Sequence, residues 1–240
     1  MKKVLILWTG GLDSTYLIIK NLFLGNKVYL GYVNISNNEN CMIAEHNARV
    51  TILKYIDKLM SKINFKGKLV TQVKQLCSIS IDDGTDFPYA QVPLFFIPLT
   101  NCIFTYDEIQ MGYVNGDYHN SDLFISKFSN IYNSYIDLIT TDITGDCADI
   151  KQIAKLTFPL SNTTKQEEIL LFKSIDNKYK TKILDNLVHC ENIQEKDGKY
   201  VSCNECGACN KFENAYDSLE GKNYYLSMQG KRDEVKYEDK

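Results

Sequence analysis

Arginine is scarce in this chain, because the 27 basic residues include only Arg49 and Arg232. Arginine supplies the planar, bidentate contacts with which proteins hold phosphates and carboxylates. The formal net charge is -3, so the charge balance does not favour a nucleic-acid partner either. Both observations argue against nucleic-acid binding as the main role of the chain.

Long apolar runs are also missing. No stretch is long enough to cross a membrane, and the apolar part of MKKVLILWTGG stops at Gly10, too early for a signal peptide. A cytoplasmic location is therefore expected. In that compartment the eight cysteines are expected to be metal ligands or free thiols rather than disulfides.

Short β-rich runs alternate with longer segments of helical periodicity. This alternation predicts an α/β fold, with a doubly wound and mostly parallel sheet covered by helices on both faces. We expect residues 1–187 to form this domain and residues 188–240 to form a small cysteine-rich segment with a C-terminal tail. The predicted strands are 3–8, 27–34, 68–73 and 108–114, and the predicted helices are 15–24, 44–63, 89–104, 123–135 and 164–175.

The stretch WTGGLDST follows the first predicted strand directly. It has neither the lysine of a Walker P-loop nor the GxGxxG spacing of a Rossmann fold. Adjacent Gly10 and Gly11 nevertheless allow close backbone approach to an anion, Ser14 and Thr15 add hydroxyl groups, and the next helix begins there. Asp13 suits a Mg²⁺ ion bound to phosphate. The alternative interpretation is a glycine turn in which Asp13 or Ser14 caps the helix.

A second motif, CNECGACNKF, contains Cys203, Cys206 and Cys209, and Cys190 lies upstream. Two overlapping CxxC steps with a fourth cysteine are typical of tetrahedral zinc, and four protein ligands indicate a structural site. We expect Gly207 to allow the sharp turn between ligands. A redox dithiol is the alternative, and it leaves the third and fourth cysteines unexplained.

The two motifs resemble a known family. TGGLDS matches the SGGxDS loop of the PP-loop (HUP-like) ATP pyrophosphatases, with Thr9 in place of the first serine. The C-terminal cysteines together with this loop resemble the QueC family of 7-cyano-7-deazaguanine synthases. Phe158-Pro159-Leu160 with Lys165 and Glu167 is similar to a further family segment, and GYVNGD at 112–117 is similar to the family's acidic loop.

The resemblance implies an AMP-forming ligase that uses ATP, Mg²⁺ and Zn²⁺. It would adenylate the carboxylate of 7-carboxy-7-deazaguanine and couple it to ammonia, which gives the nitrile. A homodimer is expected from the resemblance alone. The implied residues are Thr9, Gly10, Gly11, Leu12, Asp13, Ser14 and Thr15 for ATP, Asp13, Ser14 and Lys165 for catalysis, Asp117, Tyr89 and Phe95 for the base, and Cys190, Cys203, Cys206 and Cys209 for zinc.

Without the resemblance, several of these positions also allow a purely structural interpretation. Lys165 would then be a surface lysine, Asp117 a loop aspartate that caps the next turn, and Tyr89, Phe95 and Phe96 part of a buried core.

The chain departs from the family on the substrate side. NISNNENCMIAEH replaces a Gln-Arg-His-like stretch, PYAQVPLFF replaces Pro-Gly-Arg-Asn, and the arginine after the acidic loop is missing, with Leu123 and Phe124 nearby. A diverged enzyme of an anti-phage (CBASS-type) system, which joins a deazaguanine to a protein amine, fits these changes. Two further alternatives are a tRNA-thiolation enzyme, which needs a reactive cysteine among Cys41, Cys77, Cys102 and Cys147, and a non-catalytic zinc module that binds a partner.

Overall fold

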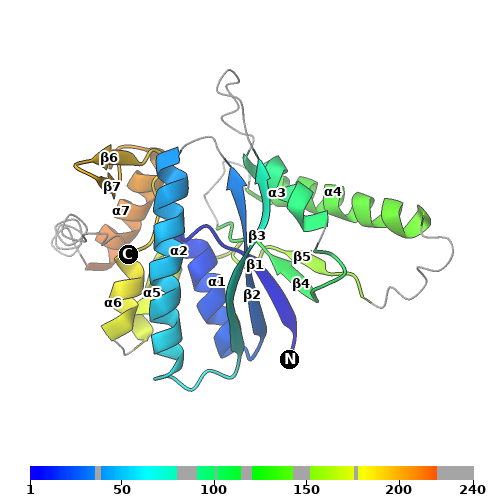
Figure 1. Cartoon of the computed structure of the whole chain (residues 1–240), viewed down its shortest axis with the longest axis horizontal. Coiled ribbons are helices and arrows are strands. Elements are labelled where there is room, and N and C mark those ends of the chain that lie inside the picture. The colour runs from blue at the N-terminus through cyan, green and yellow to red at the C-terminus, as the bar shows by residue number, and fades with distance from the viewer. Residues whose placement is uncertain are drawn as a thin grey trace.

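A five-stranded parallel sheet forms the centre of the part of the chain that the structure describes (Figure 1). The structure is a computed structural model, and it describes residues 1–35, 39–79, 91–100, 102–114, 121–142, 152–175 and 178–220. The sheet order is β3-β2-β1-β4-β5, and every neighbouring pair is parallel. Its strands are β1 (Lys3–Leu7), β2 (Lys27–Ile35), β3 (Lys68–Ile79), β4 (Glu108–Gln110) and β5 (Lys155–Thr157). The predicted α/β class is confirmed.

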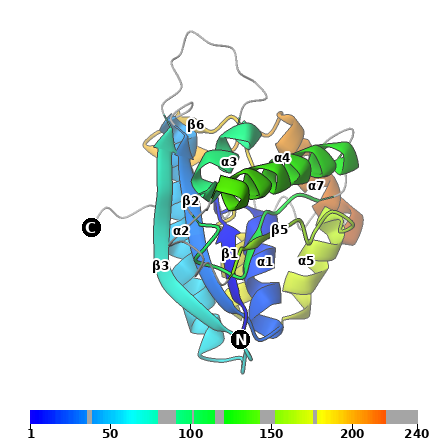
Figure 2. The same ribbon diagram turned by 90° about the vertical axis from the view of Figure 1, so that its right-hand side faces the viewer.

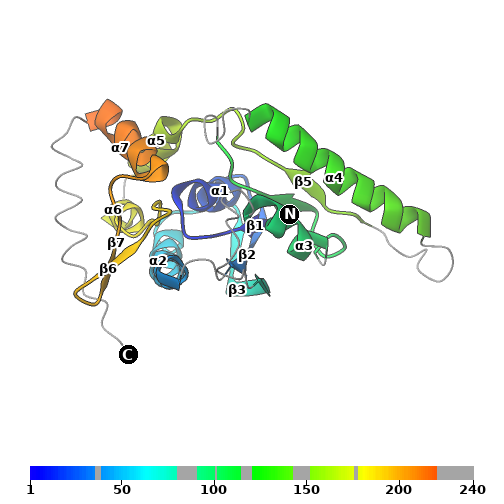
Figure 3. The ribbon, with the colours of Figure 1, turned by 90° about the horizontal axis from the view of Figure 1, so that it is seen from above.

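Helices cover both faces of this sheet. Seen from above, α1 and α2 lie on one face and α3 and α4 on the other (Figure 3). Figure 2 shows α3 and α4 across the second face, in front of the strands. α5 packs on α1, and α6 packs on α2, so the later part of the chain returns to the first face. The helices are α1 (Leu12–Phe23), α2 (Glu39–Met60), α3 (Gln91–Thr100), α4 (Ser121–Asp142), α5 (Lys165–Ser174), α6 (Lys178–Leu184) and α7 (Gly207–Glu220).

β1 is buried on both of its faces. Val4 and Ile6 belong to the core cluster beneath α1 and α2, whereas Leu5 and Leu7 belong to the cluster on the side of α3 and α4. Successive side chains of a strand point to opposite faces, so a strand with helices on both sides is apolar throughout. Full burial of one such side chain contributes about 2 kcal/mol. The two clusters therefore fix β1, and with it the loop at its end.

α1 has clear sequence signals at both ends. It begins directly after Gly11, and its inner face buries Leu17, Ile18 and Leu22. Gly25 follows with φ +83° and donates its N–H to the carbonyl of Leu22 at 3.3 Å. A glycine in the left-handed conformation is the usual way to end a helix.

Several predicted boundaries were wrong. β4 spans three residues, Glu108–Gln110, rather than 108–114. α2 begins at Glu39 rather than 44 and ends at Met60 rather than 63. α3 (Gln91–Thr100) ends before the predicted residue 104, whereas its predicted start at 89 lies outside the described residues, and α4 extends to Asp142 rather than 135. Boundaries are governed by local hydrogen bonds that apolar periodicity does not encode.

The cysteine-rich segment contains structure that was not predicted. A two-stranded antiparallel ribbon of β6 (Gln194–Lys196) and β7 (Lys199–Val201) precedes α7. Asp197 and Gly198 form the turn between the two strands, and both residues have positive φ, 54° and 72°, as two-residue hairpin turns favour. The division at residue 187 remains an interpretation.

Candidate functional site

The loop between β1 and α1 lies at the point where the strand order of the sheet reverses. β1 is flanked by β2 on one side and β4 on the other, and the chain passes from the first face to the second between β3 and β4. Open parallel sheets bind ligands beyond the carboxyl ends of their strands at such a point. Residues Thr9 to Thr15 therefore occupy the position at which this fold class holds a ligand.

Both glycines of the loop are required by its surroundings. Gly10 has φ +97°, and a Cβ there would also lie 3.2 Å from the Cβ of Ala48. A Cβ on Gly11 would lie 3.1 Å from the carbonyl oxygen of Val188. Only glycine allows this conformation at the first position and this close approach at the second.

The start of α1 has no side-chain cap. Its N-cap residue is Gly11, and no side chain there accepts a hydrogen bond from the first turn. The expectation that Asp13 or Ser14 caps the helix was wrong, since both lie inside its first turn and the Ser14 hydroxyl donates to Gly11 O at 3.4 Å. The first N–H groups of a helix carry partial positive charge and bind anions when side chains leave them open.

The loop residues differ in what their side chains can offer a ligand. Leu12 is buried in the core, so it can contribute only its backbone. Thr15 is fully buried, and its hydroxyl oxygen accepts a hydrogen bond of 3.0 Å from Nε1 of Trp8. This bond ties the start of the loop to the first turn of α1. Thr9 and Asp13 are half-buried, and Ser14 is buried.

Lys165 reaches the loop from the start of α5. Its ammonium forms an ion pair with the carboxylate of Asp13, and both side chains are 19% exposed. Thr164 and Glu167 form a capping box, in which each side chain bonds the backbone of the other residue, and these bonds lower the pKa of Glu167. The capping box fixes the first turn of α5 and so positions Lys165. Lys165 is thus held beside the loop, and its role in catalysis stays a prediction.

Gly112, which follows β4, packs against the first turn of α1. A Cβ at this position would lie 3.0 Å from the backbone nitrogen of Ser14 and 3.1 Å from the Cβ of Asp13. The end of β4 thus supports the loop from the side opposite to α2.

Sequence reasoning missed Arg49, although it is one of only two arginines. Its side chain is 7% exposed, it donates from Nη1 to the carbonyl of Thr9 at 3.3 Å, and its guanidinium lies 4.2 Å from the ring centre of Tyr32. Glu45 pairs with it at 3.5 Å. Burial raises the pKa of Glu45 to about 7, although Arg49 opposes the shift. In the sequence, the only sign of a special role for Arg49 was the rarity of arginine in a lysine-rich chain.

On the substrate side the structure describes little. Phe95 packs on the core cluster between the sheet and α3 and α4, and Phe96 makes edge contacts with Phe128, Tyr132 and Tyr135. Tyr89 and Asp117 lie outside the described residues. A role for Phe95 in stacking stays a prediction.

An apolar cavity of about 490 Å³ lies along the second half of α1, away from the loop. Tyr16, Lys20, Phe23 and Leu24 form one wall, and Leu171 and Ile175 of the α5 region form another. It contains no residue of the predicted site.

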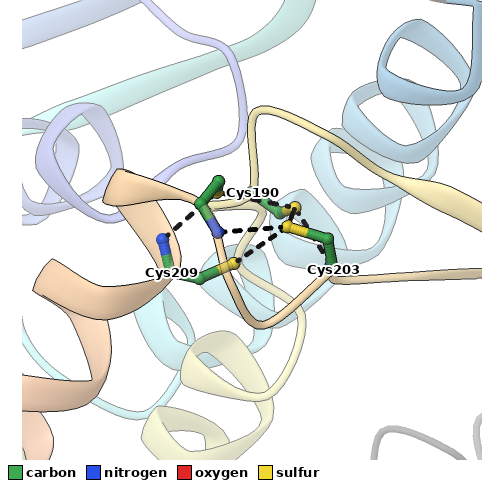
Figure 4. A group of neighbouring side chains, drawn as sticks. Cys190, Cys203 and Cys209 are labelled. Atoms are coloured by element: carbon green, nitrogen blue, oxygen red, sulfur yellow. Dashed lines mark hydrogen bonds between the residues drawn. The ribbon is translucent and has the colours of Figure 1, made fainter.

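Four cysteines meet in the C-terminal segment. The sulfurs of Cys190, Cys203, Cys206 and Cys209 all lie within 4.8 Å of one another, and Figure 4 shows those of Cys190, Cys203 and Cys209 converging. The sulfur of Cys190 lies 3.5 Å from that of Cys203 and 4.0 Å from that of Cys206, and the sulfurs of Cys203 and Cys209 are 4.0 Å apart. Four sulfurs at 2.3 Å from one zinc ion stand about 3.8 Å apart. The cluster therefore has the dimensions of a tetrahedral thiolate site.

The surroundings of these sulfurs fit bound metal. Backbone N–H groups of Asn192 and Cys203 donate to Cys190 Sγ at 3.3 Å and 3.2 Å, and such bonds favour a thiolate. Burial meanwhile raises the pKa of Cys190 to about 11 and raises the pKa of Cys209. A divalent cation supplies the charge that lets buried thiols ionise. A site of four thiolates suits zinc and leaves no open position.

The sharp turn between ligands was assigned to the wrong residue. Asn204, not Gly207, adopts a positive φ of 62°, and Gly207 is the first residue of α7. Asparagine is among the non-glycine residues that tolerate this conformation best.

No helix in the described ranges is long and apolar enough to cross a membrane. Comparison with protein families gives one match: the family described as "Queuosine biosynthesis protein QueC" matches residues 3–220. A search of curated proteins found no match. The matched range includes the glycine loop, Lys165 and all four clustered cysteines.

Proposed function

The chain belongs to the QueC family, whose enzymes are ATP-dependent ligases, and on this premise we propose that it adenylates the carboxylate of 7-carboxy-7-deazaguanine. The activated acid is coupled to ammonia and then converted to the nitrile, 7-cyano-7-deazaguanine. A carboxylate is a poor electrophile, so formation of the amide needs a leaving group, and AMP is a good one.

The observation that carries this proposal is the loop between β1 and α1, where the strand order reverses and where α1 begins without a side-chain cap. Gly11 leaves the first turn of α1 without a side-chain cap, and Lys165 brings a positive charge to the same turn. Backbone N–H groups, a helix N-terminus and an ammonium group together form a site for the phosphates of ATP.

The proposed reaction balances in two stages. A carboxylate oxygen attacks the α-phosphorus of ATP, and pyrophosphate leaves. Ammonia attacks the acyl carbon, AMP leaves with that oxygen, and the amide results. The amide oxygen then attacks a second ATP with loss of pyrophosphate, and loss of AMP with the protons of the amide nitrogen gives the nitrile.

The residues of the loop have distinct proposed roles. Gly10, Gly11 and Ser14 bind phosphate oxygens through N–H and hydroxyl groups. Asp13 holds Mg²⁺, because carboxylate oxygen is a preferred ligand of this ion. Lys165 neutralises charge on the phosphates, and for this its ion pair with Asp13 must open when ATP binds.

A further set of residues is proposed to recognise the base. We propose that Asp117 accepts hydrogen bonds from the N–H donors of the guanine-like edge, and that Tyr89 and Phe95 stack on its ring. An Asp117→Asn variant should then lose affinity for 7-carboxy-7-deazaguanine more than for ATP, measured as separate KM values.

The four-cysteine site is proposed to hold a structural zinc ion. Its four sulfurs lie close enough to bind one ion, and four thiolate ligands would complete the tetrahedral coordination of zinc and leave no position for substrate.

The described cysteines give little support to the thiolation chemistry considered above. Burial raises the pKa of Cys41, Cys77 and Cys102, which opposes the thiolate that sulfur transfer needs. Cys147 lies outside the described residues.

The test is mass spectrometry of the products formed from ATP, Mg²⁺, 7-carboxy-7-deazaguanine and ammonium. The proposal predicts AMP together with the nitrile. A stalled amide, or a deazaguanine-sized mass on an added protein, would show that the acceptor or the second stage differs. If no AMP forms, the chain is not an adenylating enzyme for this acid.

A further inference from the structure

The glycine loop is bonded directly to the segment that carries the metal ligands. The backbone N–H of Val188 donates to the carbonyl of Gly10 at 3.1 Å. The carbonyl oxygen of Val188 packs against Gly11, where it lies 3.1 Å from the place that a Cβ on Gly11 would take. Val188 precedes the first cluster ligand, Cys190, by two residues.

These contacts orient the N–H groups of the loop. The carbonyl of Gly10 and the N–H of Gly11 belong to one planar trans peptide, so they point in opposite directions. The carbonyl of Thr9 and the N–H of Gly10 likewise belong to one peptide and point in opposite directions. Arg49 donates a hydrogen bond of 3.3 Å to this carbonyl. Each bond therefore fixes the direction of one loop N–H group, that of Gly11 or that of Gly10, and such backbone N–H groups can bind a phosphate.

The position of Val188 depends in turn on the cysteine cluster. Val188 packs on the main core and on the small cluster that contains Cys190 and Cys209. The next residue, His189, stacks on Phe212 of α7 with ring centres 4.0 Å apart and planes at 6°. α7 also carries Cys209, so metal bound to the cluster fixes both sides of this stack.

α2 provides a parallel connection between the same two places. Near the start of α2, Nδ2 of Asn40 donates a hydrogen bond of 3.4 Å to the carbonyl oxygen of Ile193. The thiol of Cys41 donates to the carbonyl oxygen of Glu191 at 3.5 Å. Two to three turns later, Ala48 and Arg49 touch the loop. The cluster thus supports the loop through a main-chain bond and through one helix.

We infer that Val188 is a positioning residue through which the metal content of the four-cysteine cluster sets the affinity of the glycine loop for nucleotide. The inference rests on the proposed function, because it takes the loop as the ATP site. Coupling between two binding sites is reciprocal. Loss of zinc therefore weakens binding of ATP, and bound ATP strengthens binding of zinc by the same factor.

The first experiment uses the native zinc-loaded protein and a chromogenic chelator of known zinc affinity. The division of zinc between protein and chelator at equilibrium is measured with and without saturating Mg-ATP, and we expect the zinc affinity of the protein to be about tenfold higher with nucleotide, within the usual range of coupling between sites. The Asp13→Ala variant is the control for direct effects of ATP on zinc and on the chelator, and its zinc affinity should not change. Equal zinc affinities of the native protein, once nucleotide binding is demonstrated, overturn the inference.

The second experiment compares Val188→Pro with Val188→Ala. Proline removes the N–H that bonds Gly10, whereas alanine keeps it. We expect the proline variant to bind Mg-ATP about tenfold more weakly with one zinc per chain retained, and the alanine variant to match the native protein. Equal affinity in both variants contradicts the role of Val188. If the proline variant does not fold, the zinc affinities measured with and without Mg-ATP decide alone.

Hydrogen exchange separates failure of this inference from failure of the proposed function. Peptides that contain residues 8–15 should exchange faster in Val188→Pro than in Val188→Ala, without any nucleotide present. Faster exchange in a protein that binds no ATP would retain the structural link and reject the ATP site. Unchanged exchange in a protein that binds ATP would reject the link and retain the site.

Discussion

The ammonium of Lys165 pairs with the carboxylate of Asp13 across 152 positions of the chain. The pair joins the first turn of α5 to the first turn of α1, and so unites two segments that the sequence keeps far apart. A partly exposed ion pair contributes at most about 1 kcal/mol to stability. Its position at an uncapped helix start suggests binding of an anion rather than stability as its main role.

Replacement of Lys165 by alanine should therefore impair nucleotide binding more than folding. We expect the KM for ATP to rise about 30-fold, which corresponds to roughly 2 kcal/mol for a hydrogen bond to a charged group, while the melting temperature changes little. Initial rates and thermal unfolding test this. Lys62→Ala, at an exposed position after α2, is the matched control, and an equal effect of both changes would contradict the assignment.

A methyl group at Gly112 should displace the first turn of α1. Its Cβ would lie 3.0 Å from the nitrogen of Ser14, and a backbone atom cannot move aside as a flexible side chain does. Gly112→Ala should weaken ATP binding about tenfold or more and lower stability by about 1 to 3 kcal/mol. Titration with Mg-ATP and denaturant unfolding measure the two effects.

Gly207→Ala is the control for this change, because a Cβ at Gly207 would meet nothing within 4 Å. It should retain both stability and ATP affinity. Normal ATP binding by Gly112→Ala would mean that β4 does not support the loop.

Cys206→Ser should lose the metal ion. Serine is a poor replacement for a thiolate ligand, and the remaining three sulfurs cannot complete the tetrahedron. We expect less than one zinc per chain by elemental analysis, and a loss of stability on the order of 4 kcal/mol. Cys77→Ser, on β3 and outside the cluster, should retain full zinc. One zinc per chain in Cys206→Ser would disprove the four-cysteine assignment.

The ion pair between the partly exposed Glu45 and the buried Arg49 predicts a pH dependence of stability. The pKa of Glu45 is about 7 in the folded chain, above its ordinary value of 4.5. The folded state therefore binds a proton more tightly than the unfolded state, so this group makes stability fall as pH rises from about 4.5 to 7. Denaturant unfolding at pH 5 and pH 8 should show a smaller difference in Glu45→Gln than in the native protein. An unchanged difference would contradict the shift.

The sequence predicts best those features that depend on short motifs. The glycine loop was placed correctly because VLIL, Gly10 and Gly11 mark a buried strand followed by a tight turn. The four cysteines were grouped correctly because CxxC spacing itself brings ligands together. The first two strands and α1 could also be predicted, because each contains an apolar run about as long as a typical strand or helix.

Contacts between distant segments could not be predicted in the same way. Arg49 reaches Thr9 over 40 positions, and Val188 bonds Gly10 from a segment that follows the last strand of the central sheet. β5 has three residues, and α6 has the polar sequence KYKTKIL, so neither shows a clear periodic pattern. Asn204 rather than Gly207 takes the positive φ, because the cluster geometry rather than residue preference decides the turn.

The most direct test of adenylation at this loop follows the oxygen atoms of the carboxylate. 7-Carboxy-7-deazaguanine labelled with ¹⁸O in its carboxylate is incubated with the protein, Mg-ATP and ammonium, and the AMP is analysed by mass spectrometry. The account predicts that every molecule of AMP carries one ¹⁸O, because each AMP leaves with one oxygen of the acid. It also predicts that Asp13→Ala forms no AMP. Unlabelled AMP, or labelled AMP formed equally well by Asp13→Ala, would contradict it.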